Sequence, residues 1–115
     1  MKWVSVLVRP FRVDEVVAAL EAIGVGRLTV TEVQEWSEHT VHDPADEDEE
    51  VLESGPGFVP HLRIEMALPD EQLRRAIDAV RRSAPSGAHA EDRILVWPLG
   101  FAMRIRTAES GEAAL

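Results

Sequence analysis

The sequence predicts one α+β domain whose elements run strand, helix, strand, strand, helix, strand. Two different spacings of apolar residues along the chain predict these elements. Apolar residues alternate in several short stretches, as in a half-buried strand, and recur at helical spacing in two longer ones. The third observation is length, because 115 residues are the usual scale of one domain. We therefore expect residues 1–115 to fold as a single unit.

The first half of the chain changes period once. From Lys2 to Val8 apolar positions alternate, and Pro10 closes this strand because proline donates no hydrogen bond to a ladder. A helix follows from Val13, and Gly24 ends it. Its apolar stripe comprises Val16, Val17, Leu20 and Ile23. Leu28 to Gln34, rich in threonine and valine, predicts the second strand.

The second half repeats the pattern. A strand resumes at His61, with Leu62, Ile64 and Met66 on one face. A helix opens at Pro69, and its apolar stripe comprises Leu73, Ala76, Ile77, Val80 and Ala84. The last strand is expected in two pieces, Ile94 to Trp97 and Met103 to Thr107, with a break at Pro98 and Gly100. Residues 108–115 are expected to form a tail.

This order of elements is the split pattern of a ferredoxin-like fold with an antiparallel sheet. The helices of such a fold cover only one face of the sheet. The first strand, however, has Val6 on one face and Trp3 and Leu7 on the other. A second apolar face needs a cover, and self-association is its simplest source. We also expect Trp3, Trp36 and Trp97 to anchor the core or an interface.

Acidic residues outnumber basic ones, 21 to 12, which gives a formal net charge of -9. That balance argues against binding to nucleic acid or to anionic membranes. The chain has no cysteine, which excludes disulfides and thiol nucleophiles and fits a reducing compartment. The early apolar run is too short for a membrane span, so we expect no membrane insertion and a cytoplasmic protein.

A long segment without periodicity, residues 35–60, separates the second and third strands. Its middle is acidic and contains Asp43, Asp46, Glu47, Asp48, Glu49, Glu50 and Glu53. Like charges in such a block repel one another and resist packing. Loops of this length in compact domains are uncommon unless they are functional or disordered. We expect this loop to act in binding.

Four blocks of the sequence carry a family resemblance. They are Arg9-Pro10-Phe11-Arg12-Val13-Asp14-Glu15-Val16, Leu28-Thr29-Val30-Thr31-Glu32-Val33, Val59-Pro60-His61-Leu62-Arg63-Ile64-Glu65 and Met103-Arg104-Ile105-Arg106-Thr107. In this order and spacing they closely resemble the PII signal-transduction family, the nitrogen regulatory proteins P-II. The resemblance implies a homotrimer that binds adenine nucleotides in clefts between subunits. It makes residues 35–60 the T-loop, which would control a transporter or enzyme of nitrogen or inorganic-carbon metabolism.

The resemblance implies nucleotide-binding roles for Thr29, Glu65, Gly87, Ala90, Arg93, Arg104 and Arg106. Thr29 and Glu65 stand where the family recognises adenosine. Arg104 and Arg106 stand where it binds phosphates, and on the expected strand they would project to one side. Arg93 replaces a phosphate-binding lysine of the family.

The expected phosphate loop, residues 86–93, departs from the family pattern. Gly87 is kept, but Ala90 and Asp92 stand where glycines let backbone amides approach phosphate. A carboxylate there repels a triphosphate most. We therefore expect ADP, AMP or another adenine ligand in preference to ATP.

The base of the expected T-loop also departs from the family pattern. Glu35 and Ser37 replace glycines of the family, and Glu38 replaces a basic residue. His39 and His61 replace the glutamine and lysine that serve magnesium-dependent binding of 2-oxoglutarate, so we do not expect that binding. The residues expected to contact a partner are Trp36, Glu38, His39, His42, Asp46 and Glu49. The chain has no tyrosine, so tyrosine uridylylation is excluded.

Two alternatives stay open beside a non-enzymatic regulator that senses an adenine nucleotide. His39 and His42 could hold a divalent metal with nearby carboxylates, which would make the chain a trimeric metal-responsive protein. Their spacing is permissive and not diagnostic, and we assign no metal site. The chain could also be an interaction module that has lost its nucleotide. No pattern of nucleophile, base and positioning group predicts catalysis, so we do not expect an enzyme.

Overall fold

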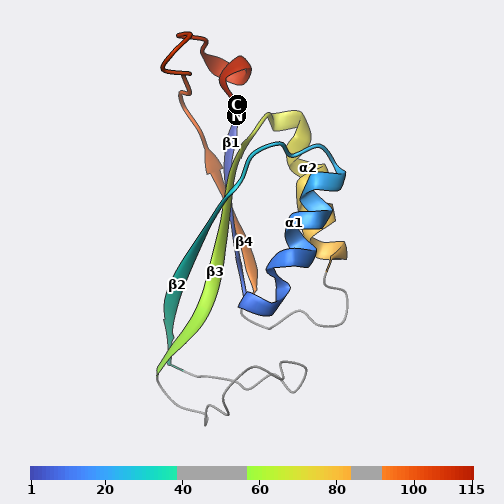
Figure 1. Ribbon diagram of the computed structural model, residues 1–115, viewed down its shortest axis with the longest axis vertical. Coiled ribbons are helices and arrows are strands. Elements are labelled where there is room, and N and C mark those ends of the chain that lie inside the picture. Colours follow the sequence, from blue (N-terminus) through green and yellow to red (C-terminus); the bar gives the residue numbers. More distant parts are fainter. Residues whose placement is uncertain (39–56, 84–91) are drawn as a thin grey trace.

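The structure is a computed structural model that describes residues 1–38, 57–83 and 92–115. Its helices and strands are β1 (Lys2–Val8), α1 (Val13–Ala22), β2 (Thr29–Ser37), β3 (Gly57–Leu68), α2 (Leu73–Arg82) and β4 (Arg93–Pro98). The four strands form one antiparallel sheet in the order β2-β3-β1-β4. The predicted ferredoxin-like order of elements is confirmed (Figure 1).

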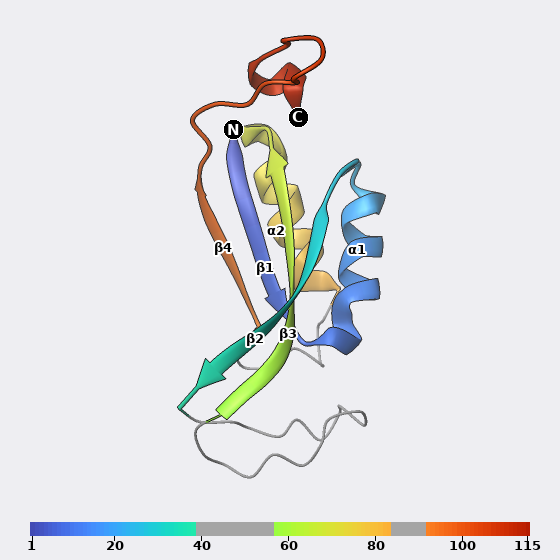
Figure 2. The same cartoon turned by 60° about the vertical axis from the view of Figure 1, so that its left-hand side comes forward.

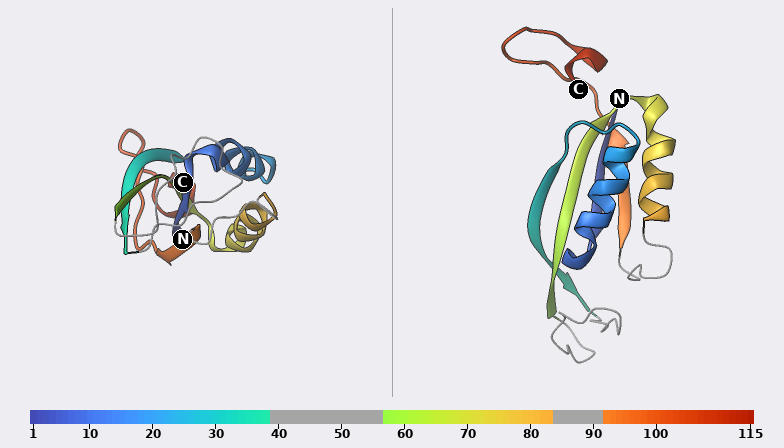
Figure 3. Two further views of the ribbon diagram at one scale, coloured as in Figure 1. Left: turned by 90° about the horizontal axis from the view of Figure 1, so that it is seen from below. Right: turned by 45° about the vertical axis from the view of Figure 1, so that its right-hand side comes forward.

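Both helices cover the same face of the sheet (Figure 3). Each is preceded by a single turn of 3-10 helix, Pro10–Arg12 and Asp70–Gln72. The core between sheet and helices is made by Val4, Val6, Val8, Val16, Leu20, Ile64, Met66, Leu68, Ala76 and Val80. Leu20 and Ile64 are both 0% exposed, so truncating either to alanine would cost about 2–5 kcal/mol of stability. Most of the predicted helical stripes therefore face the core, with Val17, Ile23 and Leu73 packed against it. Ile77 is not among these residues, and Ala84 lies outside the described residues.

The face of the sheet that points away from the helices is apolar along β1 and β4. Cross-strand register places Trp3 beside Trp97 and Ser5 beside Leu95, and these residues alternate with the core positions. Leu95 and Trp97 are each 44% exposed. No described segment of the chain covers these two side chains fully, so the second apolar face expected from β1 is present.

The hairpin of β2 and β3 is longer than predicted. The predicted loop, residues 35–60, is wrong at both ends because Glu35 pairs with Val59 and Ser37 pairs with Gly57. Pro60 pairs with Gln34 beyond the point where β1 ends. There β3 has a neighbouring strand on one side only, a position that tolerates proline. Residues 39–56, in the predicted T-loop, and residues 84–91, which include most of the expected phosphate loop, lie outside the described residues.

The predicted strand from Met103 to Thr107 is also wrong. Residues 105–107 form a turn, and Met103 makes an isolated bridge to Ser110. The Arg104 amide donates to Glu109 O at 2.9 Å, and the Ala108 amide donates to Arg104 O at 2.8 Å. The chain leaves the edge of the sheet after β4, so this segment folds on itself as a small hairpin (Figure 2). Ala108 lies in the left-handed region, with φ 60°.

Among residues 1–38, 57–83 and 92–115, no helix is long and apolar enough to cross a membrane.

Candidate functional site

A pocket of about 830 Å³ lies where the C-terminal segment meets the open face of the sheet. Its wall includes Trp3, Thr29, Glu65, Phe101, Met103 and Leu115. The volume falls in the range of about 300–1,000 Å³ that is usual for small-molecule sites. Aromatic and apolar side chains beside a carboxylate and a hydroxyl could hold a flat heterocycle and orient it by hydrogen bonds.

Glu65 is the polar centre of this pocket. Thr29 of β2 lies directly opposite Glu65 of β3 in the sheet register, as an adenosine-recognising pair would need. Trp3 Nε1 donates a hydrogen bond to Glu65 Oε2 at 3.0 Å, and Arg63 Nε lies 3.2 Å from Glu65 Oε1. Both carboxylate oxygens are therefore engaged. The sequence identified Trp3 only as an apolar anchor, and no local signal links it to Glu65, which lies 62 positions away.

A second carboxylate, Glu35, lies toward the other end of the same sheet face. Its Oε1 accepts a hydrogen bond from Arg93 Nη2 at 2.5 Å. Its Oε2 lies 3.9 Å from His61 Nδ1. The side chain of Glu35 is 20% exposed and that of Arg93 is 44% exposed. The cation expected to bind a ligand phosphate is thus already bound to a carboxylate of its own chain.

His61 lies under this ion pair, with its side chain 0% exposed. Its Nδ1 is 3.1 Å from Val59 O, and because a carbonyl can only accept, Nδ1 carries the proton and donates. His61 Nε2 and Glu35 Oε2 are buried without a hydrogen-bond partner in the described part of the chain. The imidazole is therefore buried beside Glu35 but makes no hydrogen bond to it.

The expected phosphate-binding arginines do not come together in one chain. Arg93 begins β4 at the end of the sheet where β1 finishes, whereas Arg104 lies in the C-terminal segment at the opposite end (Figure 1). Arg104 Nη2 donates to Leu115 O at 3.3 Å, and Arg106 is exposed in the turn. Register also separates Glu65 from Arg93 by two strands and two residues, which corresponds to roughly 12 Å between Cα atoms.

Asp92, the carboxylate expected near a phosphate, faces the helix side of the sheet edge. It lines a cavity of about 220 Å³ together with Val8, Val80 and Arg81. Arg93 forms an ion pair with Glu35. In the sequence alone, Glu35 is notable only as a departure from the glycine of the family, and its partner Arg93 lies 58 positions away.

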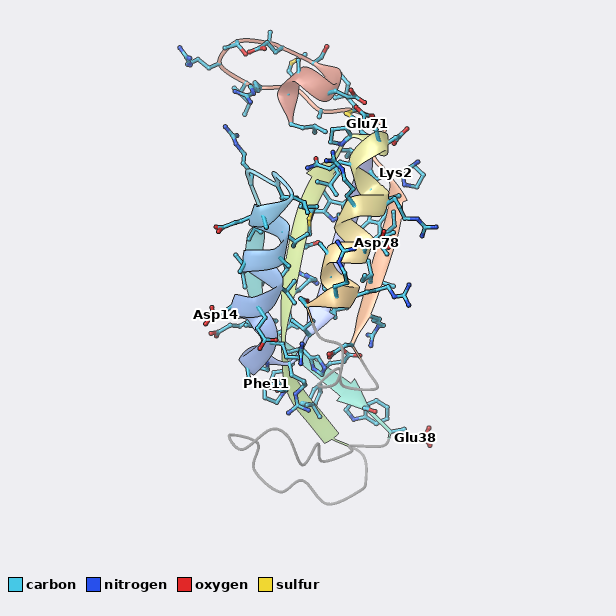
Figure 4. The ribbon with its side chains drawn as sticks, turned by 90° about the vertical axis from the view of Figure 1, so that its right-hand side faces the viewer. Lys2, Phe11, Asp14, Glu38, Glu71 and Asp78 are labelled. Carbon is cyan, nitrogen blue, oxygen red and sulfur yellow. The ribbon has the colours of Figure 1, made fainter. Side chains whose placement is uncertain are left out.

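The described end of the β2-β3 hairpin is apolar and exposed. Trp36 and Phe58 are cross-strand neighbours, 56% and 64% exposed. Glu38, the residue after β2, lies at the end of the molecule remote from Lys2 and Glu71 (Figure 4). The remaining predicted partner and loop residues, His39, His42, Asp46, Glu49, Gly87 and Ala90, lie outside the described residues. Within the described ranges, no group of three or more metal-ligating side chains forms a metal site.

Comparisons with known proteins agree with one another over the length of the chain. A family model described as nitrogen regulatory protein P-II matches residues 1–109. Over 115 residues, and over the whole of both chains, the sequence is 39% identical to nitrogen regulatory protein P-II of Rhizobium etli. It is 38% identical to nitrogen regulatory protein GlnK of Escherichia coli K12, again over both whole chains. Arabidopsis thaliana PII, solved with bound citrate, superposes with a TM-score of 0.73 at 28% identity, covering 99% of this chain and 91% of that one.

Proposed function

This chain belongs to the nitrogen regulatory protein P-II family, and from that premise we propose that it is a homotrimeric, non-enzymatic regulator that senses an adenine nucleotide between its subunits. The nucleotide would be ADP, AMP or ATP, and its occupancy would be passed through the T-loop to a partner protein in the cytoplasm. The partner would be a transporter or an enzyme of nitrogen or inorganic-carbon metabolism.

The observation that carries this proposal is the division of the expected site. Thr29 and Glu65 face each other in a pocket large enough for a nucleoside. The expected phosphate ligands Arg93, Arg104 and Arg106 lie at two other places in the same chain. A second copy of the chain could bring its own arginines to this pocket, which would complete a site at each subunit boundary.

The open face of the sheet supports self-association. Leu95 and Trp97 are half exposed there, beside Trp3 and Leu7 on the adjoining strand. An apolar sheet face of this kind favours burial against another subunit. The same packing would cover the pocket and exclude water from a bound ligand.

The hairpin supports the signalling part of the proposal. Arg93 and Glu35 join the strand next to the expected phosphate loop to the base of the expected T-loop. A ligand that binds one arrangement of this contact more tightly than another would shift the population of hairpin conformations. Trp36 and Phe58, exposed at the end of the described hairpin, would then offer apolar contacts to the partner.

Isothermal titration calorimetry with ATP, ADP, AMP and cyclic AMP, each with and without Mg²⁺ and 2-oxoglutarate, tests the proposal. We expect saturable binding of at least one nucleotide, no effect of 2-oxoglutarate, and a mass by light scattering that corresponds to a trimer. The combined Arg104→Ala, Arg106→Ala variant should weaken binding at least about tenfold, because it removes charge-assisted hydrogen bonds to phosphate.

The matched control is Arg74→Ala with Arg75→Ala, which removes two exposed arginines from α2, away from the pocket. This control should bind nucleotide as the parent does. A trimer that binds none of the four nucleotides would refute the nucleotide-sensor proposal. Equal losses in both double variants would show that general charge, not the C-terminal arginines, attracts the ligand.

A further inference from the structure

The ion pair between Glu35 and Arg93 spans the sheet from one edge strand to the other. Glu35 belongs to β2 and Arg93 to β4, and the two strands between them are β3 and β1. The arginine can reach across because β1 ends at Val8, whereas β3 extends to Gly57. The contact therefore depends on the fold as a whole.

The carboxylate is held where it is accessible enough to be replaced. One of its oxygens accepts from Arg93 at 2.5 Å and the other faces buried His61 at 3.9 Å. The Glu35 side chain is 20% exposed and the Arg93 side chain 44% exposed, so solvent reaches the arginine. A guanidinium group binds carboxylate and phosphate oxygens with the same planar geometry.

We propose that Glu35 is a specificity-determining residue. Its carboxylate binds Arg93 where a phosphate of the ligand would otherwise bind, so that the site selects an adenine nucleotide with a single phosphate. This inference rests on the proposed function. A longer phosphate chain that reaches Arg93 must displace the carboxylate and then remain beside it. Repulsion between like charges grows with each added phosphate charge and is strong where water is partly excluded.

Two departures from the family pattern agree with this role. The resemblance places glycine at position 35, which has no side chain to compete, and lysine at position 93. This chain has Glu35 and Arg93, and the fold brings these two changed positions into contact. Arginine suits the arrangement better than lysine because its planar group fixes the direction of the carboxylate.

Titration of AMP, ADP and ATP, without Mg²⁺, into the parent trimer and into Glu35→Gln tests the inference. The parent should bind AMP most tightly and ATP least. In Glu35→Gln the affinity for ATP should rise about tenfold, or about 1.4 kcal/mol, while that for AMP should change less than about twofold. The order of preference would then flatten or reverse. Glu35→Thr, which suits a strand, repeats the test if the glutamine variant unfolds early.

The matched control is Glu32→Gln, which removes one negative charge from the same strand at an exposed position on the other face of β2. It should leave the order of nucleotide preference unchanged. If the parent binds nucleotides but Glu35→Gln and Glu35→Thr keep its order, the inference fails and the proposed function stands. If no variant binds a nucleotide, the proposed function fails and this inference falls with it.

Discussion

The two carboxylates on the open face of the sheet, Glu65 and Glu35, are held in different ways. Glu65 takes its partners from its own strand and from β1, since Arg63 is two residues away and Trp3 lies on the adjacent strand. Glu35 takes its cation from β4, across the full width of the sheet. Glu65 therefore has partners on its own strand and on the adjacent one, whereas Glu35 relies on a partner from the opposite edge strand of the sheet.

Under the proposed function, this difference would decide which end of the sheet responds to a ligand. At the pocket end, losing Arg63 leaves Glu65 the Trp3 hydrogen bond, and losing Trp3 leaves it the ion pair with Arg63. At the hairpin end, losing Arg93 leaves a largely buried carboxylate beside His61, a buried group that already donates to Val59 O. A doubly held carboxylate suits a fixed recognition surface, and a singly held one suits a contact that exchanges with ligand.

Charge reversal at the hairpin end should have the largest effect. Glu35→Arg puts a second cation beside Arg93 over buried His61, and we expect the free energy of unfolding to fall by about 2 kcal/mol. Adding Arg93→Glu should restore at least half of this loss, because the pair is rebuilt in reverse. Urea unfolding at one protein concentration measures both, with Glu32→Arg as the control. No recovery in the double variant would contradict a direct pairing.

Removing one cation from each end should give unequal losses. Arg93→Gln leaves Glu35 without its arginine and should cost about 1–2 kcal/mol. Arg63→Gln should cost about 0.5 kcal/mol or less, because Arg63 is 42% exposed and Trp3 continues to donate to Glu65. Thermal and urea unfolding of the two variants side by side give the comparison. Equal costs would mean that the two carboxylates are held alike.

The last prediction concerns the pocket end of the sheet, where the C-terminal hairpin forms part of the pocket wall. Ala108 has φ 60°, a left-handed conformation that costs an L-residue about 1–2 kcal/mol. Ala108→Gly should therefore stabilise the protein by about 0.5–1 kcal/mol, once the extra freedom of glycine in the unfolded chain is subtracted. Ala18→Gly, at an exposed position of α1, should destabilise the protein by about 1 kcal/mol. Differential scanning calorimetry should show a higher Tm for Ala108→Gly and a lower Tm for Ala18→Gly. A lower Tm for both variants would refute the backbone strain at Ala108.

The fold could be predicted wherever local period reflects burial. The stripe of α1 and the alternation of β1 both face the core, so each pattern identified its element. Period failed between Met103 and Thr107, because alternating apolar residues form a strand only beside a partner strand and this segment lies past the edge of the sheet. The apolar period also failed to predict the strand at residues 35–37. Cross-strand pairing continues there, although the sequence has no strand-like alternation.

The candidate site could be predicted only in part. Family resemblance identified Thr29 and Glu65, which the register places opposite each other. It could not identify what holds Glu65, because the Trp3 hydrogen bond joins residues far apart in the chain. The partner of Arg93 was hidden for the same reason. Contacts of this kind depend on strand order, which no local pattern contains.

The Glu35 and Arg93 contact has a consequence for how this protein and its relatives diverge. An unpaired carboxylate at this largely buried place costs stability, so a chain that gains the acid before a cation at position 93 is at a disadvantage. Lineages should therefore carry an acid at position 35 only together with a cation at position 93. Related chains with glycine at position 35 should tolerate either lysine or arginine at position 93. Their nucleotide preference should differ from that of this chain.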